Sequence, residues 1–409
     1  MPCVSSNATM GEEVIISELT HDQQVGTPRR ALAFGSITHV WSDAFFALIH
    51  PLLPFIALDL NLTYSQSGLL KGIFAGATGV LQIPSGFLAE RWGEFGLLVG
   101  GNIWVGAGLV AMGLAQTYGI LLTAAAVTGL GGGTQHPVAS AMVARTHERG
   151  KAYTAIGTLN FAGDLGKMVG PAVAAVAVVT LHWRTILILV GGTGAVVMAA
   201  SIPFHRSVRP PPHRADAGDA SASDDADSPT TGFIALIIAG MLDATTRGAA
   251  LTFLPFVLAD KGLGASQISG LFVVLFAGGA VGKLLLGWLG DRVGPLVLIW
   301  GSKGLAAVLL VVFLAPLPGA ALVPLIAVLG FGLNGTSSVF YGTVARLVSP
   351  QRAGRRYGIY YTATEVASAS APALYGVLAD MVGLSSTMTT MAAVTLAVLP
   401  ASLLLRRYL

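Results

Sequence analysis

The sequence predicts an all-α membrane protein of twelve transmembrane helices, arranged as two pseudo-symmetric six-helix bundles. Of the 409 residues, 54% are hydrophobic and only 11% are charged, whereas roughly a quarter of residues are charged in soluble proteins. Apolar stretches of about 20 residues, long enough to cross a hydrocarbon layer of ~30 Å, recur roughly twelve times. They do not alternate as β-barrel strands do, so helices are the spanning structure we expect.

The chain also repeats itself, because landmarks of its first half return 201 residues further on without any insertion. A repeat of this length indicates two duplicated domains and not a solenoid of short units. The matching positions include Leu53-Pro54-Phe55 with Leu254-Pro255-Phe256, Ser65-Gln66 with Ser266-Gln267, Gly86 with Gly287, Arg145 with Arg346, Asp164 with Glu365, and Pro171 with Pro372.

The first bundle is predicted to occupy residues 29–205, after a disordered cytoplasmic tail at 1–28. Its six helices are expected near 31–58, 66–90, 96–116, 119–144, 152–180 and 183–204. The 52 glycines of the chain favour this arrangement, because small residues let transmembrane helices approach one another closely.

A polar segment rich in Pro, Asp, Ala and Ser, residues 206–231, interrupts the hydrophobic pattern and is predicted to be a flexible cytoplasmic linker. The second bundle is predicted to occupy residues 232–409. Its helices are expected near 232–259, 266–290, 295–316, 320–345, 356–380 and 384–405.

Basic residues are distributed unevenly among the predicted loops. Most Lys and Arg lie in the tails and in alternate loops, while only Arg184 and Lys261 lie in the opposite set. The positive-inside rule therefore places both termini in the cytoplasm, and the basic composition needs no nucleic-acid partner. The single cysteine, Cys3, lies in a polar tail without an apolar signal core, so neither a disulfide framework nor a cleaved signal peptide is expected.

A short motif follows the second predicted helix of each half. Gly86-Phe-Leu-Ala-Glu90-Arg91-Trp-Gly93 and Gly287-Trp-Leu-Gly-Asp291-Arg292-Val-Gly294 both resemble the Gly-x-Leu-x-Asp-Arg-x-Gly signature of the major facilitator superfamily. An acid and an arginine beside turn-forming glycines suit a charge latch that breaks when the two halves rock. Arg145 and Arg346 are assigned to the same latch. A plain topogenic turn is the alternative.

A glycine pattern marks the fifth predicted helix. Gly157, Gly166, Gly170 and Pro171 follow the spacing Gly-x8-Gly-x3-Gly-Pro, which resembles the antiporter motif of drug-exporting members of the superfamily. Small residues on one face would let this helix pack closely against its neighbour across the two halves, and Pro171 would kink it. Packing without a transport role is the alternative.

The first and fourth predicted helices carry a closer resemblance. Ser36-x-x-His39-x-x-x-Asp43, and the segment from Gly131 to Arg145 with its His136-Pro137 pair, look like the fosmidomycin-resistance group of exporters. This likeness covers most of the first half, while the second half shows only the superfamily pattern, so the substrate stays open.

Ionisable groups in the first helix are candidates for proton coupling, since such groups at bilayer depth cost several kcal/mol unless they are paired or hydrated. His39, Asp43, Phe46 and His50 recur at helical spacing, which places them on one face that looks into a cavity. Histidine titrates near neutrality, so His39 and Asp43 are predicted to exchange protons, Asp43 first. A permanent His–Asp hydrogen bond is the alternative.

The fifth helix adds Asn160, Asp164 and Lys167, and the step from Asp164 to Lys167 allows an ion pair. The resemblance implies that this helix packs near the first, so Asp43 is expected to join the pair as a second carboxylate. Lys167 would then neutralise one acid and leave the other to titrate, unless the pair is inert. His136 is expected to replace the superfamily's usual helix-four arginine as a polar or proton site, or else to be a buried structural histidine.

The second half supplies fewer charges. Asp243 and Arg247 stand four residues apart, which suits an ion pair. Glu365 repeats the position of Asp164 and is assigned with it to proton coupling. Lys303 is expected to be structural, because its helix is peripheral in the fold that the resemblance implies. Orienting hydrogen bonds to the substrate are expected from Asn334, Tyr341, Tyr360 and Tyr361.

The resemblance and the buried charges together predict a proton-coupled secondary transporter that exports a small, drug-like organic compound by alternating access, with its site near the midplane. A symporter that imports an organic anion is one alternative, and a non-transporting receptor or scaffold is another. The residues assigned to substrate binding are His50, His136, Asn160, Lys167, Asp243, Arg247, Asn334, Tyr341 and Tyr361.

No enzyme, metal site or cofactor is predicted. The sequence shows no hydrolase elbow, phosphate loop, paired-cysteine metal site or dinucleotide fingerprint in a suitable context. The expected partners are a small-molecule substrate, protons driven by their gradient, and the lipid bilayer. We expect a multi-pass monomer in the bacterial inner membrane.

Overall fold

The computed structural model describes residues 8–147, 149–204, 230–347 and 353–408. All regular structure in these ranges is helical. The helices of the first half are α1 (Ala8–Leu60), α2 (Tyr64–Trp92), α3 (Glu94–Leu114), α4 (Tyr118–Gly132), α5 (Gln135–Thr146), α6 (Arg149–Ala177), α7 (Trp183–Ala200) and the short η1 (Ile202–Phe204). Those of the second half are α9 (Thr230–Asp260), α10 (Ala265–Val293), α11 (Pro295–Val312), α12 (Gly319–Asn334), α13 (Thr336–Leu347), α14 (Ala353–Val382), α15 (Leu384–Leu403) and η3 (Leu404–Arg407).

These helices provide the predicted twelve spans of the described chain when α4 with α5, and α12 with α13, are each read as one interrupted span. Eight segments are long and apolar enough to cross a membrane by length and composition alone. The other spans, α2, α4 with α5, α6 and α14, contain either a helix break or several charged residues.

A proline accompanies the break between α4 and α5, although Ser338 occupies the equivalent position of the second half. Pro137 lacks an amide hydrogen for the carbonyl of Gly133, four residues earlier. The Ser85 hydroxyl donates to that carbonyl at 3.3 Å instead. The break repeats in the second half, where α12 ends at Asn334 and α13 begins at Thr336.

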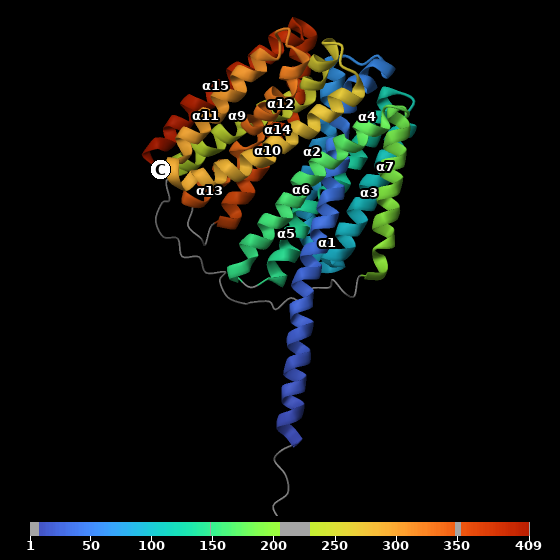
Figure 1. Cartoon of the computed structure of the whole chain (residues 1–409), viewed down its shortest axis with the longest axis vertical. Coiled ribbons are helices and arrows are strands. Elements are labelled where there is room, and N and C mark those ends of the chain that lie inside the picture. The colour runs from blue at the N-terminus through green and yellow to red at the C-terminus, as the bar shows by residue number, and fades with distance from the viewer. Residues whose placement is uncertain (1–7, 148, 205–229, 348–352, 409) are drawn as a thin grey trace, which may run out of the picture.

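The hydrophobic core shows how the two halves meet. One cluster of buried side chains contains residues of both halves, such as Phe45 and Phe253. Two further clusters are each confined to one half, one around Met142 and the other around Phe340. The halves therefore share a core at one end and have separate cores at the other (Figure 1). We call the end with the α1–α2 and α9–α10 turns the closed end, and the end with the α2–α3 and α10–α11 turns the open end.

Contacts between α2 and α14 hold the closed end together. A Cβ atom added to Gly68 would come within 2.0 Å of the Pro372 carbonyl oxygen, so the two backbones touch. At Gly79, further along α2, nothing lies within 4 Å. The helices therefore diverge toward the open end.

Hydrogen bonds between the halves complete the closed end. Asp380 of α14 accepts hydrogen bonds from the backbone amides of Tyr64 and Ser65, both at 2.9 Å. In the repeat-related position, the Ser266 hydroxyl donates to the Ala175 carbonyl at 2.7 Å. Both contacts involve the first residues of α2 or α10.

The N-terminal tail differs in part from its prediction. The sequence predicts disorder at 1–28, whereas the structure continues α1 from Ala8 as a helix that projects from the bundle in Figure 1. Residues 8–27 contain few strong helix breakers apart from Gly11 and Gly26, and Pro28, where this extension meets the bundle, lies inside the same helix. Most of the predicted linker at 206–231 lies outside the described residues.

The motif glycines form the expected turns at the open end. Gly93 and Gly294 have φ angles of 76° and 89°, a region that favours glycine. Arg145 of α5 forms an ion pair with buried Glu94 of α3, and Arg346 donates to the Gly290 carbonyl at 3.4 Å. Both contacts lie within one half, and the side chains of Glu90 and Asp291 lie outside the described residues. The latch role of these residues stays a prediction.

The glycines of α6 pack on a different neighbour from the one expected. A Cβ atom added to Gly166 would lie 2.4 Å from the Val40 carbonyl oxygen, and one added to Gly170 would lie 2.3 Å from that of Ala44. Their partner is thus α1 of the same half, and the prediction of packing across the two halves is wrong for these positions. Gly157 has no atom within 4 Å.

Candidate functional site

A cavity of about 750 Å³ lies between the two halves. Helices α1, α2, α5 and α6 of the first half line it together with α9, α10, α13 and α14 of the second, and the last residues of α4 and α12 also face it. Most of the predicted site residues line this cavity: His39, Asp43, His50, His136, Asn160, Asp164, Lys167, Arg247, Asn334, Tyr341, Tyr361 and Glu365.

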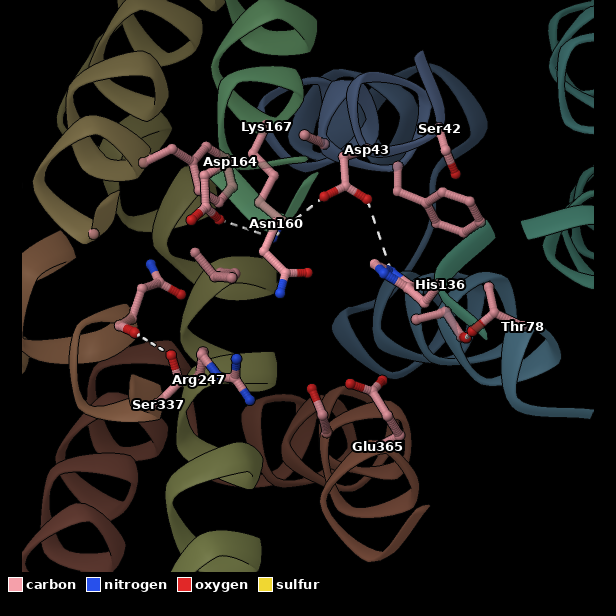
Figure 2. Close-up of a pocket in the computed structure, with 18 of the residues that line it drawn as sticks. Ser42, Asp43, Thr78, His136, Asn160, Asp164, Lys167, Arg247, Ser337 and Glu365 are labelled. Atoms are coloured by element: carbon pink, nitrogen blue, oxygen red, sulfur yellow. Dashed lines mark hydrogen bonds and ion pairs between the residues drawn. The ribbon is translucent and has the colours of Figure 1, made fainter. Parts of the chain in front are cut away.

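A chain of alternating charges crosses the cavity wall (Figure 2). Lys167 Nζ lies 3.3 Å from Asp43 Oδ2 and 3.1 Å from Asp164 Oδ1. Lys283 Nζ lies 2.6 Å from the same oxygen of Asp164. Since Lys283 belongs to α10 and Asp164 to α6, the last ion pair joins the two halves. The structure thus brings the expected acids and Lys167 together and adds a second lysine.

The two histidines beside Asp43 differ in access to the cavity. His39 Nε2 lies 3.7 Å from Asp43 Oδ2, and its side chain is only 3% exposed. His136 Nε2 lies 3.9 Å from Asp43 Oδ1, and its side chain is 54% exposed. Neither distance is a hydrogen bond. His136 is therefore the one that a molecule in the cavity can reach, whereas His39 lies behind it.

This triad has the residue types of a metal site, since the ligand atoms of His39, Asp43 and His136 lie within 4.8 Å of one another. The ammonium of Lys167, 3.3 Å from Asp43, competes with a cation for that carboxylate. Repulsion between the two positive charges opposes metal binding while Lys167 is protonated.

His50 lies where the halves meet. Its Nδ1 is 3.1 Å from the Leu251 carbonyl oxygen, 201 residues along the chain. A carbonyl oxygen only accepts, so Nδ1 carries the hydrogen. The ring also lies against Phe272 of α10, with centroids 6.1 Å apart. His50 therefore joins α1 to two helices of the second half.

Other charged groups in the cavity have no such partners. Among the described residues, no hydrogen bond or ion pair is recorded for Lys71, Arg247 or Glu365, although Lys71 lies 5.2 Å from the centre of the Phe74 ring. Arg247 Nε and Asn334 Nδ2 are buried without a hydrogen-bond partner. In Figure 2, Arg247 and Glu365 approach the same space from different helices.

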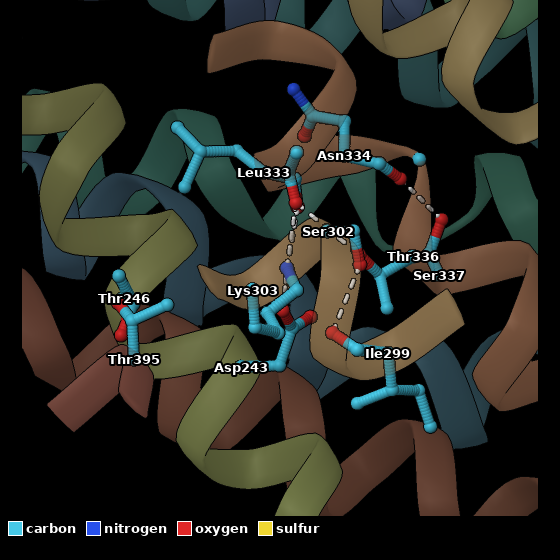
Figure 3. Close-up of polar contacts among 12 residues, drawn as sticks. Asp243, Thr246, Ile299, Ser302, Lys303, Leu333, Asn334, Thr336, Ser337 and Thr395 are labelled. Carbon is cyan, nitrogen blue, oxygen red and sulfur yellow. Dashed lines mark hydrogen bonds and ion pairs between the residues drawn. The ribbon is translucent and has the colours of Figure 1, made fainter. Parts of the chain in front are cut away.

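The predicted Asp243–Arg247 ion pair is wrong. Asp243 instead pairs with Lys303 of α11, whose ammonium also donates to the Gly332 carbonyl at 2.8 Å (Figure 3). Asp243 and Lys303 are 4% and 1% exposed, and neither lines the cavity. The four-residue spacing within α9 allows Asp243 to pair with Arg247, but Lys303 of α11 lies nearer to Asp243. Asp243 is therefore not placed to bind a substrate in this cavity.

Sequence reasoning left two cavity cations, Lys71 and Lys283, out of the site. Both were visible as charges within otherwise apolar stretches, which is the signal that marks functional residues in membranes. Neither has a charged counterpart 201 residues away, where Phe272 and Gln82 stand. Only the packing of α2 and α10 shows that both lysines turn toward the cavity and not toward the ends of their helices.

Comparison with known proteins agrees with this architecture. The family model described as Major Facilitator Superfamily matches residues 35–232 and 236–408. The chain belongs to this superfamily. Its members are transporters, so the chain is a multi-pass membrane transporter of small molecules.

Several proteins similar to this chain are named for transport or for drug resistance. The fosmidomycin resistance protein of Escherichia coli is 27% identical over 357 residues, which cover 84% of this chain and 85% of that protein. A probable sulfoacetate transporter of Cupriavidus necator is 26% identical and covers 81% of this chain and 82% of its own. The multidrug resistance protein MdtG of Yersinia enterocolitica is 30% identical over a shorter stretch, 39% of each chain.

Solved structures share the fold. A bacterial homologue of the human lysosomal transporter Spinster, in an inward-facing and unoccupied conformation, superposes with a TM-score of 0.77 and 15% sequence identity. The match covers 93% of this chain and 98% of that chain. At this identity the likeness shows the fold alone.

Proposed function

We propose that this transporter exports a small organic compound in exchange for protons, by alternating access. The observation that carries the proposal is the ion pair between Lys283 and Asp164, at 2.6 Å. It joins the two halves inside the cavity, and one of its partners is a carboxylate that a proton can neutralise.

Protonation of Asp164 would remove the negative charge that holds Lys283 to the first half. Lys167 would keep Asp43 as its counter-ion at 3.3 Å. Because a lysine without its carboxylate is costly in a low-dielectric cavity, the halves would then favour an arrangement that hydrates Lys283. Release of the proton on the other side would restore the pair, so proton movement and rocking are coupled.

The positive-inside distribution of Lys and Arg assigns the open end to the cytoplasm, with both termini on that side. The bacterial relatives support a location in the bacterial inner membrane. A substrate would enter the cavity from the cytoplasm and leave after the closed end opens. We propose that a single chain performs this cycle, since the cavity is lined by both halves of one chain.

Export of an antibiotic-like compound is supported by the names of two relatives, a fosmidomycin resistance protein and a multidrug resistance protein. Uptake of an organic anion is the second candidate, and it is favoured by a relative described as a probable sulfoacetate transporter. Counterflow measurements in vesicles of known orientation distinguish the two directions.

The proposal is tested with purified protein reconstituted in vesicles, with fosmidomycin as the first compound. Asp164→Asn is expected to lower flux driven by a pH gradient by about 5- to 150-fold, the range of typical coupling free energies, while counterflow without a gradient continues. Asp43→Asn is expected to have a similar effect. Asp260→Asn, an exposed carboxylate outside the cavity, is the matched control. Full gradient-driven flux in both cavity variants would refute proton coupling through this network.

A further inference from the structure

The cavity has an excess of positive charge. Among the described residues that line it, the cations are Lys71, Lys167, Lys283 and Arg247, and the acids are Asp43, Asp164 and Glu365. Lys167 and Lys283 are engaged by Asp43 and Asp164. The remaining group consists of Lys71, Arg247 and Glu365, none of which forms an ion pair with another described residue. Its formal charge is positive without any contribution from histidine.

This remaining group spans the two halves. Lys71 belongs to α2 of the first half, and its side chain is 5% exposed in total. Arg247 and Glu365 belong to α9 and α14 of the second half. A buried lysine and a buried guanidinium nitrogen without hydrogen-bond acceptors are costly. Both donors therefore favour a ligand that brings an acceptor into the cavity.

We propose that Lys71 and Arg247 form the binding site for the anionic group of the transported compound, which is a small organic anion with an apolar body. This inference rests on the proposed transport function and adds the substrate's chemical class. The guanidinium offers two parallel donors to a carboxylate, phosphonate or sulfonate. Lys71 supplies a second positive charge from the opposite half. The buried amide nitrogen of Asn334 is a third donor without a partner.

The rest of the cavity suits an apolar body. Phe46, Phe276, Tyr341 and Tyr361 line it, and the rings of the two tyrosines lie 4.9 Å apart. Ligand sites of this kind usually combine apolar walls with a few placed polar groups. A volume of about 750 Å³ accommodates a compound of drug-like size.

Glu365 is the internal competitor of the bound anion. It lies at electrostatic range of both Lys71 and Arg247. It also acts on His136 of α5 and Tyr341 of α13. The Glu365 carboxylate opposes the charge of the two cations, whereas a glutamine at this position would leave their full charge to the ligand. Anion binding is therefore expected to be stronger in Glu365→Gln than in the wild type.

The experiment uses full-length protein in detergent and benzenesulfonate as the probe, because a sulfonate is a permanent anion. Affinity is measured by ligand-dependent thermal stabilisation and by calorimetry. Benzenesulfonamide and benzylammonium are the neutral and cationic probes of similar shape. We expect benzenesulfonate to bind at least about tenfold more tightly than either, a ratio that corresponds to 1.4 kcal/mol.

Variants assign the effect to residues. Lys71→Gln and Arg247→Gln are each expected to weaken benzenesulfonate binding by about tenfold or more, as expected for loss of a charged hydrogen-bond donor. Lys71→Arg keeps the charge and is expected to keep most of the affinity. Glu365→Gln is expected to tighten benzenesulfonate binding. Arg407→Gln, an exposed cation at the C-terminal end, is the control.

Equal binding of the sulfonate and the sulfonamide would overturn the proposal. So would benzenesulfonate binding that Glu365→Gln leaves unchanged, and this result can be read even if a glutamine variant of Lys71 or Arg247 does not fold. Anion binding without proton-driven flux would refute the proposed function and leave this inference standing. Proton-driven flux together with tighter binding of the neutral or cationic probe would refute this inference and leave the proposed function standing.

Discussion

The ion pair of Asp243 and Lys303 is an example of buried charges that lie in the protein core and not in the cavity proposed for transport. Both side chains are almost fully buried and lie outside the cavity. By contrast, the charges of Asp43, Asp164 and Lys167 line it. A buried pair is weak evidence for stability, but removal of one partner leaves an uncompensated charge.

Lys303→Met is therefore expected to destabilise the protein by about 3–5 kcal/mol, because Asp243 would be left buried without its counter-ion. The measurement is thermal unfolding of the purified protein in detergent. Asp243→Leu combined with Lys303→Met is expected to recover most of the loss, since both charges are gone. A single variant as stable as Arg407→Gln would contradict this assignment.

For single residues, the sequence predicted the candidate site well where the residues share one helix face and poorly where they lie on different helices. His39, Asp43 and His50 follow from the spacing within α1. The partner of Asp243 and the second partner of Asp164 do not, because Lys303 and Lys283 reach them from other helices. Spacing along one helix gives possible pairs, while packing between helices decides which of them form.

At the level of whole helices, the glycines of α6 determine how closely this helix approaches α1. Gly166 and Gly170 bring its backbone against the carbonyls of Val40 and Ala44, and this approach places Asp164 and Lys167 beside Asp43. Gly163 belongs to the same surface, since an added Cβ would lie 2.7 Å from Asp43 Oδ2. Helix packing and the charge network therefore depend on the same few small residues.

Gly170→Ala is expected to destabilise the bundle by about 1–3 kcal/mol, the usual cost of overpacking. Gly157→Ala is the matched control on the same helix, where the new methyl group meets no atom within 4 Å. It is expected to be neutral or to stabilise by about 0.5–1 kcal/mol, because alanine favours helix more than glycine does. Melting temperatures of the two purified variants give the comparison, and equal values would contradict the close α1–α6 contact.

The helical elements were the most predictable part of the fold. Apolar length and the repeat gave the number and order of the spans, and the motif glycines gave the turns at Gly93 and Gly294. The break before α5 was only partly predictable, since Pro137 indicates a bend and not the replacement hydrogen bond from Ser85. The neighbour of the α6 glycines could not be read from one helix, because any close helix suits a small-residue face.

For the whole molecule, the closed end depends on a few contacts between the halves. Asp380 lies in the exposed last turn of α14, at the end of the span predicted over 356–380, and accepts hydrogen bonds from the first amides of α2. Partial burial raises the pKa of the Asp380 carboxyl, but hydrogen bonds from Ser65, Tyr64 and Thr63 outweigh it and hold that pKa below its usual range. The negative charge also suits the positive end of the α2 dipole.

Asp380→Ala is expected to shift the population toward opening of the closed end. Spin labels at Gln116→Cys and Met381→Cys, in a Cys3→Ser background, report the distance between the halves there. A longer and broader distance distribution is expected in the variant, whereas Asp260→Asn, an exposed carboxylate without a recorded bond to the other half, is expected to leave it unchanged. Identical distributions in all three proteins would show that other contacts alone close this end.

The same labels test the pH dependence of closure. A lowered pKa means that the contribution of Asp380 is present above the usual carboxyl pKa and is lost as the pH falls through the lower value. With a usual value of about 3.9, the contact is expected to stay intact between about pH 5 and 8. A distance that changes across this range in wild type but not in Asp164→Asn would assign the change to the cavity network and not to Asp380.

The hydrogen bond from His50 to Leu251 joins positions that are 201 residues apart, the spacing of the repeat itself. In an object with twofold symmetry, a point and its symmetry mate can touch only where both lie beside the rotation axis. This bond therefore marks the centre line of the molecule. A motion that keeps this symmetry displaces the two symmetry-related positions by equal amounts in opposite directions away from the line, so the distance between His50 and Leu251 is a direct measure of whether the halves have separated at this depth.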